Sequence, residues 1–157
     1  MEVSTRLTTT GDLAEVVRLV RDAHRGVSDQ RGGAHWLATA ALPEPLDETV
    51  TDALAAPGCI ALVGLIDDVP VGVAVAHLDV WRDATRVGIV RYLYVEAEAR
   101  QVGVGESLLD AIVEWARSNG CDALESMALP GDRELKNMFE RYGLVARAIV
   151  VHRRLDR

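Results

Sequence analysis

The sequence lacks any run of about 18 consecutive apolar residues, the length that a helix needs to cross a membrane. Its first residues, MEVSTRLTTTGD, also lack the basic stretch and apolar segment that mark a secretory signal peptide. We therefore expect a cytoplasmic protein without a membrane partner.

Cysteine is scarce, and basic residues are outnumbered by acidic ones. The two cysteines, Cys59 and Cys121, lie in apolar segments, which favours two thiols in a reducing compartment over a disulfide. The 17 Lys and Arg residues against 24 Asp and Glu give a net charge of −7. Because proteins bind nucleic acid by neutralising phosphates with cations, this balance predicts no nucleic-acid partner.

The length and the apolar periodicity predict one domain that spans residues 1–157. A chain of 157 residues buries enough surface for a core of its own. Strands are predicted at 1–9, 59–67, 70–81, 85–98, 122–129 and 144–155, and irregular structure at 27–47. Helices are predicted at 10–26, at 47–58, in the amphipathic stretch that follows the glycine loop, and at 131–143. This order implies a mixed sheet with helices on its faces, an α/β (α+β) fold.

Two glycines, Gly103 and Gly105, lie between a predicted strand and a predicted helix. Unpaired amides and a partial positive charge at a helix N-terminus suit an anion, and glycine lets a phosphate approach them closely. The stretch has no Lys-Ser/Thr pair, which a P-loop requires, and Leu108 stands where a dinucleotide fingerprint requires a third glycine. Taken alone, the two glycines also fit a purely structural turn.

The residues Arg100-Gln101-Val102-Gly103-Val104-Gly105 spell R-x-x-G-x-G after the strand RYLYV and the acidic turn EAEA. This stretch resembles motif A of the GCN5-related N-acetyltransferase (GNAT) superfamily, and the order of elements resembles that family over nearly the whole chain. The resemblance implies a mostly antiparallel sheet of six to seven strands, flanked by about four helices, with a central split that holds acyl-CoA.

The resemblance also implies which residues hold the cosubstrate, acetyl-CoA, with no metal involved. The loop amides would bind its pyrophosphate, and Leu93 and Val95 would pair with its pantetheine arm like an added strand. One amide there would polarise the thioester carbonyl. The implied binding residues are Leu93, Val95, Arg100, Gln101, Val102, Gly103, Val104, Gly105, Glu106, Ser107, Asp132 and Phe139, with the Glu106 carboxylate expected to point into water.

Acetyl transfer to an amine requires that the amine lose a proton. Glu96 and Glu98 follow the strand beside the expected cosubstrate and are candidate bases, although both also fit a solvated turn. His77, Asp79 and Glu125 are alternatives. A lone histidine in an apolar strand is more often structural, and an exposed strand face explains Glu125 equally well. We expect Glu96 and Glu125 to be the better candidates.

The sequence departs from the family where a general acid is expected. The segment DRELKNMFERYGL is similar to the family signature N-x-x-A-x-x-x-Y-E-x-x-G-F, but it has Asp132 at the Asn position and Phe139 at the Tyr position. Phe139 carries no proton. Tyr142, one helical turn later, is the candidate replacement, and packing at the helix end explains it as well.

The acceptor is expected to be a primary amine of a small molecule or of a protein. Its pocket would involve Trp36, Trp81, Arg31 and His35. The apolar segment 144–155 would allow a homodimer. A noncatalytic acyl-CoA sensor is the main alternative to an enzyme, and an unrelated αβ domain whose glycine loop is a turn is the third.

Overall fold

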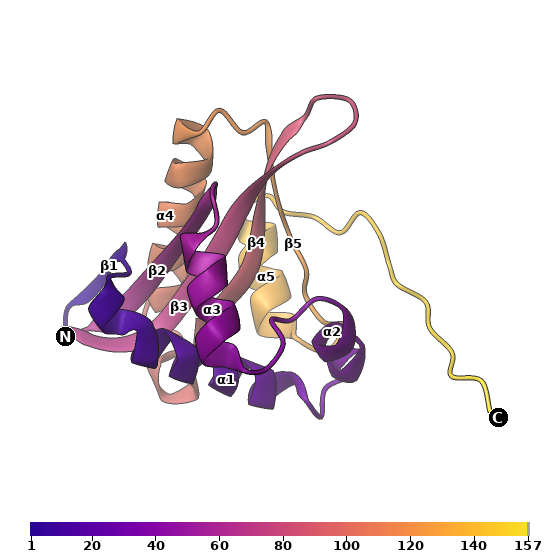
Figure 1. Cartoon of the computed structure of the whole chain (residues 1–157), viewed down its shortest axis with the longest axis horizontal. Coiled ribbons are helices and arrows are strands. Elements are labelled where there is room, and N and C mark those ends of the chain that lie inside the picture. The colour runs from indigo at the N-terminus through magenta and orange to yellow at the C-terminus, as the bar shows by residue number, and fades with distance from the viewer. Residues whose placement is uncertain (157) are drawn as a thin grey trace.

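The computed structural model describes residues 1–156 and has one five-stranded sheet (Figure 1). The strands lie side by side in chain order, and the first four are antiparallel while β4 and β5 are parallel. They are β1 (Val3–Leu7), β2 (Cys59–Ile66), β3 (Val69–Val80), β4 (Arg86–Val95) and β5 (Ala123–Ser126). The mixed, mostly antiparallel sheet that the resemblance implies is confirmed, with five strands within residues 1–156 in place of the expected six to seven.

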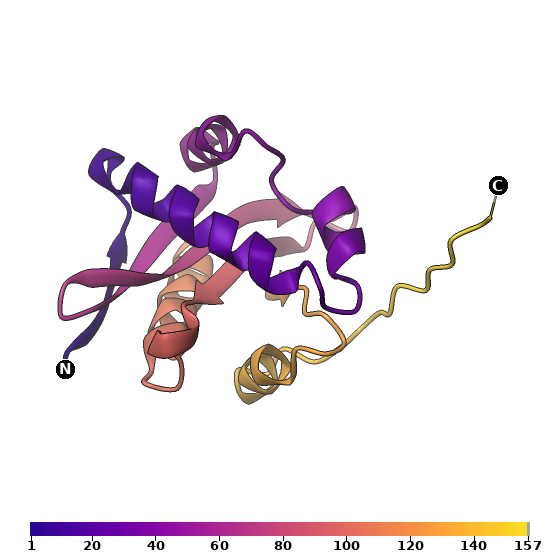
Figure 2. The same ribbon diagram turned by 90° about the horizontal axis from the view of Figure 1, so that it is seen from below.

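Helices cover both faces of this sheet (Figure 2). One face carries α1 (Leu13–Val27), α2 (Gly33–Thr39) and α3 (Leu46–Ala55), and the other carries α4 (Val104–Ser118) and α5 (Arg133–Arg141). Two short 3₁₀ helices, η1 (Thr10–Asp12) and η2 (Ala97–Ala99), precede α1 and the glycine loop. The sheet therefore lies between two helical layers.

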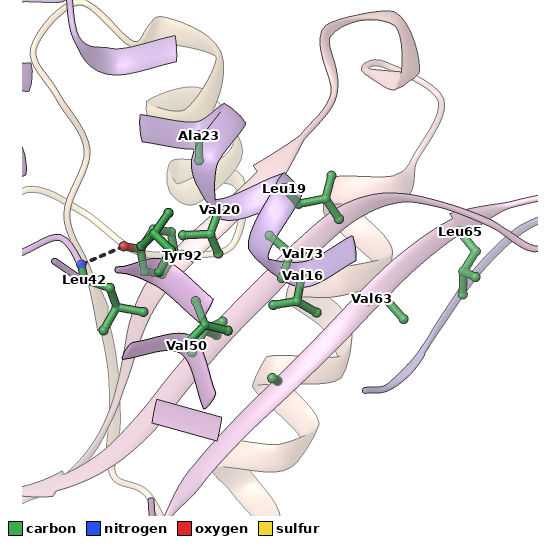
Figure 3. Close-up of a cluster of buried hydrophobic side chains, with 13 residues drawn as sticks. Val16, Leu19, Val20, Ala23, Leu42, Val50, Val63, Leu65, Val73 and Tyr92 are labelled. Carbon is green, nitrogen blue, oxygen red and sulfur yellow. Dashed lines mark hydrogen bonds between the residues drawn. The ribbon is translucent and has the colours of Figure 1, made fainter. Parts of the chain in front are cut away.

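Each layer has its own hydrophobic core, because successive strand residues point to opposite faces. Val16, Leu19 and Val20 of α1 pack with Val73 of β3 and Tyr92 of β4 on one face (Figure 3). On the other face Leu108 and Ile112 of α4 pack with Ala74 and Val90. The spacing of the apolar residues in α1 and α4 follows the helical period, so each helix buries one stripe.

Two glycines let α4 lie close to the sheet. A Cβ on Gly64 of β2 would stand 2.6 Å from Val104 Cγ1, and one on Gly72 of β3 would stand 3.1 Å from the same atom. Any side chain at Gly64 would therefore push the first turn of α4 away. These contacts fix the position of the helix start that follows the glycine loop.

Two sequence-based predictions of secondary structure are wrong. Residues 27–47 contain α2 instead of being irregular throughout, because a seven-residue helix is too short to show a clear apolar period. Residues 144–155 form no strand: they extend away from the body, and Ile149 and Val151 are 86% and 90% exposed (Figure 1). A strand needs a hydrogen-bonding neighbour, and no strand within residues 1–156 pairs with this arm.

The parallel pair β4 and β5 separates partway along its length. Pairing runs from Val87 with Ala123 to Val90 with Ser126, where β5 ends. β4 continues through Arg91–Val95 with only β3 beside it. The sheet therefore has a split between the end of β4 and the segment that follows β5, as the sequence predicts.

Candidate functional site

The glycine loop places a helix N-terminus at the end of this split. Gly103 has φ +99° and stands at the N-cap of α4, and no side chain caps the helix. Gln101 also has a left-handed backbone, with φ 65°. The first amides of α4 therefore lack intrahelical partners and a capping oxygen, and they are free to bind an anion.

Space around the loop also fits a bound phosphate. A Cβ built on Gly103 meets no atom within 4 Å, so the backbone there faces open space. Gly105 faces Met138 of α5, whose Cε would stand 2.9 Å from a Cβ at that position. Gly103 and the uncapped amides thus leave room for a phosphate at the start of α4.

The side chains of the loop are directed elsewhere. Arg100 donates from Nε to the Val95 carbonyl at 2.9 Å and lies over the ring of Tyr94. Ser107 shares a hydrogen bond of 2.7 Å with Thr5 of β1. Glu106 forms an ion pair with Arg141 at 3.1 Å, instead of standing alone in water. The anion-binding groups of this loop are thus its backbone amides.

The free edge of β4 carries the second binding element. Glu96 donates its backbone N–H to the Val71 carbonyl of β3 at 2.9 Å. Because alternate residues of a strand hydrogen-bond to the same neighbour, the N–H groups of Leu93 and Val95 point to the opposite edge, where β5 has ended. This edge can accept an extended ligand as an added strand.

Two adjoining cavities lie along the split. The first, the α5 cavity, has a volume of about 410 Å³ and lies between the end of β4, the glycine loop and α5. Its lining includes Val95, Gln101, Gly105, Glu106, Asn137, Met138 and Arg141. The second, the α1 cavity, has about 490 Å³ and lies between the C-terminal end of α1, α2, β4 and the segment after β5.

The two cavities share lining residues, so they adjoin along the split. The shared residues are Leu93, Tyr94, Arg100, Asp132, Glu134 and Leu135. Asp132 is the N-cap of α5, and its carboxylate accepts the Leu135 N–H at 3.1 Å. Phe139 is buried and lines the α1 cavity. A donor in one cavity and an acceptor in the other would meet at Leu93.

The three candidate catalytic residues lie outside both cavities. Glu96 faces α1 and forms an ion pair with Arg18. Glu125 is exposed on β5, opposite Ile89, while its neighbour Ser126 lines the α1 cavity. The structure does not bring these two carboxylates to the split.

The Tyr142 hydroxyl is held on α4. It donates to Asp110 Oδ1 at 2.7 Å, and the Glu106 carbonyl lies 3.1 Å away. Partial burial and the Asp110 carboxylate raise the pKa of Tyr142 to about 12. Tyr142 thereby fastens α5 to α4, and it lines neither cavity.

The residues expected in the acceptor pocket divide into two groups. Arg31 and Trp36 line the α1 cavity. Trp81 is 43% exposed in the β3–β4 hairpin, and His35 lies beside His152 of the C-terminal arm, so neither lines it. His77 and Asp79, the alternative bases, lie on β3 outside both cavities.

Sequence reasoning missed several residues of the α1 cavity. No motif or spacing distinguished Arg91 and Ser126 from the apolar strands around them. Gln30 lay in a segment predicted to be irregular. Tyr92 also lines this cavity, and its hydroxyl lies 2.8 Å from His24 Nε2. Burial lowers the pKa of His24, so this pair is neutral near pH 7. Only the alternation of β4 and its aromatic content could have indicated Tyr92.

The described part of the chain has neither a metal-binding cluster nor a membrane-spanning helix. Among residues 1–156, no three His, Cys, Asp or Glu side chains are grouped closely enough to hold a metal ion. Over the same residues, no helix combines the length and apolar character that crossing a membrane requires.

Comparison with solved structures shows the fold. A transcriptional regulator from Bacillus halodurans C-125 is 17% identical, covering 98% of this chain and 100% of that one, with a TM-score of 0.75. The acetyltransferase AAC(6')-Iy, solved with the bisubstrate analogue CoA-S-monomethyl-acetylneamine, is 19% identical over 99% of both chains, with a TM-score of 0.73. A ribosomal-protein-alanine N-acetyltransferase from Brucella melitensis biovar Abortus 2308 is 20% identical over 99% of both, with a TM-score of 0.68.

Comparison with sequences shows the family. No curated protein sequence matches the chain. The sequence model of the acetyltransferase (GNAT) family matches residues 29–144, which include the glycine loop, β4, β5 and α5. The resemblance of the R-x-x-G-x-G motif is therefore confirmed, and the chain belongs to the GNAT acetyltransferase family.

Proposed function

We propose that this protein is an acetyl-CoA-dependent N-acetyltransferase that acts on a primary amine of a small molecule or a protein. The observation that carries the proposal is the uncapped start of α4 at Gly103, placed beside the free edge of β4. An uncapped helix end and an unpaired strand edge meet there, at two adjoining cavities. Family membership supports acetyl transfer as the general activity.

The chain's own backbone supplies the proposed binding contacts. The amides of residues 101–105 hold the pyrophosphate, and the N–H groups of Leu93 and Val95 hold the pantetheine arm and the thioester carbonyl. Acetyl-CoA, when bound, supplies an activated acetyl group. An N–H at Leu93 directed at the carbonyl oxygen stabilises the negative charge that develops there during attack by the amine.

We assign the rate mainly to positioning and to this backbone contact. The new C–N bond forms as the C–S bond breaks, the amine proton passes to solvent, and the thiolate takes a proton from solvent. Glu96, Glu125 and Tyr142 lie outside both cavities, which supports a mechanism without a dedicated side-chain acid or base. Holding amine and thioester together supplies several kcal/mol without such a group.

A noncatalytic acyl-CoA sensor is the second candidate. Phe139 lines the α1 cavity where the family signature has a tyrosine, and the Tyr142 hydroxyl is held by Asp110. One structure with the same fold is described as a transcriptional regulator, which is compatible with a regulatory role. The sensor and the enzyme both bind acetyl-CoA and differ only in turnover.

Release of free thiol from acetyl-CoA tests the choice between them. We expect amine-dependent thiol release above the rate without amine, together with mass-spectrometric detection of the acetylated amine. Saturable acetyl-CoA binding without any acetylated product across small amines and peptide amino termini would favour the sensor.

We also propose that the protein is cytoplasmic and pairs with a second copy through the C-terminal arm. Both cysteines are free thiols, which suits a reducing compartment. Val145, Ile149, Val150, Val151 and Leu155 of the arm are all exposed in the single chain. Light scattering on the full chain and on a version that ends at Gly143 tests the pairing: a monomer in both would contradict it.

A further inference from the structure

The α1 cavity has an unusual charge for a protein with a net charge of −7. Four arginines line it, Arg31, Arg91, Arg100 and Arg133, and none forms an ion pair within residues 1–156. Two carboxylates line it as well. Asp132 is occupied as the N-cap of α5, which leaves Glu134, an exposed residue. The lining is therefore cationic.

Arg91 is the arginine that the fold positions most firmly. It is the extra residue of a β-bulge, because Val75 pairs with Tyr92 and Ala76 pairs with Val90. A bulge re-aims a side chain, and here it puts the half-buried guanidinium at the cavity wall. Its one hydrogen bond, from Nη2 to the Ala40 carbonyl, is 3.3 Å long.

A half-buried guanidinium with most of its donors free is costly unless an anion pairs with it. Carboxylates fit this group because its fork donates two parallel hydrogen bonds. Arg31, from the loop before α2, lines the same cavity and is exposed and unpaired within residues 1–156. The cavity thus offers two guanidinium groups on the side away from the glycine loop.

An unsatisfied acceptor lies in the same wall. Gln30 donates its amide nitrogen to the Gly26 carbonyl at 2.8 Å, which fixes the orientation of the amide. Its Oε1 is buried and has no hydrogen-bond partner. A ligand that brings an N–H or O–H donor together with an anion would complete both groups.

We infer that the acceptor is a small amine that carries a carboxylate, which Arg91 binds with help from Arg31 while Gln30 accepts a donor from the same molecule. This inference rests on the proposed function, since it names the substrate class for that site. A polycationic acceptor, by contrast, would meet four like charges in the cavity. The cavity should therefore select against aminoglycosides, which carry several positive charges.

Matched acceptors test the inference. We would compare 4-aminobutyrate with n-butylamine, leucine with leucinamide, and O-phosphoethanolamine with ethanolamine, with kanamycin as the polycation. We expect kcat/KM for each carboxylate acceptor to exceed that of its neutral partner by about tenfold or more. Equal or better use of n-butylamine and leucinamide, or preference for kanamycin, would overturn the inference, and preference for O-phosphoethanolamine alone would replace the carboxylate with a phosphate.

Variants separate recognition from folding. Arg91→Gln is expected to raise KM for 4-aminobutyrate about tenfold or more, with kcat and acetyl-CoA affinity nearly unchanged. Arg91→Lys should restore part of the loss. The matched control is Arg82→Gln, which removes an arginine that lines neither cavity and should leave the carboxylate preference intact. An Arg91→Gln protein that keeps the wild-type preference would contradict the assignment.

A binding measurement separates this inference from the proposed function. Calorimetric titration of 4-aminobutyrate and of n-butylamine into protein saturated with CoA reports carboxylate recognition without turnover. Failure to bind CoA at all would contradict the proposed function. Titration of 4-aminobutyrate and n-butylamine into the free protein would then still test whether the α1 cavity recognises a carboxylate. Equal binding of both amines would end it.

Discussion

The hydroxyl of Tyr92 lies 2.9 Å from the backbone nitrogen of Leu42, which donates to it (Figure 3). The same oxygen lies 2.8 Å from His24 Nε2, so the hydroxyl shares a second hydrogen bond with His24 while it accepts from Leu42. One phenol therefore joins β4 to α1 and to the segment before α3. Two of these elements, β4 and the C-terminal end of α1, line the α1 cavity.

Replacing this tyrosine should destabilise the fold. Tyr92→Phe leaves the buried Leu42 N–H without a partner, which costs about 1–3 kcal/mol in the free energy of unfolding. Chemical denaturation measures it. Tyr94→Phe is the matched control, because the Tyr94 hydroxyl makes no hydrogen bond within residues 1–156, and it should change the unfolding free energy by much less. Equal effects of the two changes would contradict the role of the Tyr92 hydroxyl.

A methyl group at Gly64 should disturb the packing of α4. Gly64→Ala places a Cβ within 2.6 Å of Val104 Cγ1, and overpacking of this kind costs about 1–3 kcal/mol. Thermal denaturation measures the effect. Gly26→Ala is the control of opposite sign: its Cβ meets nothing within 4 Å in α1, so the change should stabilise by about 0.5–1 kcal/mol. A neutral Gly64→Ala variant would show that α4 does not depend on this close approach.

Acid should destabilise the fold at the contact between Arg6 of β1 and Asp12 of η1. Arg6 donates two hydrogen bonds to Asp12, at 2.7 and 3.0 Å, and the Thr9 N–H donates a third at 2.7 Å. The Arg6 guanidinium, followed by the Thr9 amide, holds the pKa of the Asp12 carboxyl well below its usual range. Because the pKa is lowered in the folded state, the stabilisation is present above the unfolded value of about 3.9 and is lost as the pH falls below it.

Comparison with Asp12→Asn isolates this effect. Near pH 7 the variant should be less stable by about 1–2 kcal/mol, since it loses the charge-assisted bonds and the capping contact. The difference should shrink as the pH is lowered from 5 to 3 in denaturation experiments. A difference that is independent of pH would mean that the carboxylate charge contributes nothing.

Glu96 and Tyr142 should be dispensable for turnover. Glu96 faces Arg18 and Tyr142 bonds to Asp110, so neither reaches the split. Glu96→Gln and Tyr142→Phe are each expected to keep kcat within about tenfold, whereas a lost general acid or base costs about 10²–10⁴. Rates measured over a range of pH provide the check. A larger loss, accompanied by loss of one limb of the pH profile, would restore the residue as an acid or base.

The sequence predicts those parts of the structure that depend on residues adjacent in the chain. The loop Arg100–Gly105 and the helix after it were recognisable because glycines at a helix start and an apolar stripe are features of neighbouring residues. The segment 144–155 has strand-like side chains, yet whether it becomes a strand depends on a partner that its own residues do not encode. Its prediction failed for that reason.

The cavity residues were hidden for a similar reason. Arg91 reaches the cavity through a bulge between two strands, and no pattern in RVGIVRYLYV shows that β4 has one more residue than β3 at this point. Glu96 and Glu125 were predicted from their places at and within strands, and Tyr142 from its spacing after Phe139. Arg18 and Asp110, which hold Glu96 and Tyr142, come from α1 and α4. Side-chain direction at the split thus depends on tertiary contacts.

The central claim is that the backbone at Gly103 binds the pyrophosphate of acetyl-CoA. Calorimetric titration with acetyl-CoA of the wild type, Gly103→Glu and Gly143→Glu tests it most directly. Gly103 and Gly143 both have left-handed backbones, with φ +99° and +80°, and a Cβ at either meets nothing within 4 Å, so the two variants carry similar strain and the same charge. We predict saturable binding by the wild type and by Gly143→Glu, and a loss of about 100-fold or more in affinity for Gly103→Glu. Equal binding by all three folded proteins, or none by the wild type, would contradict the claim.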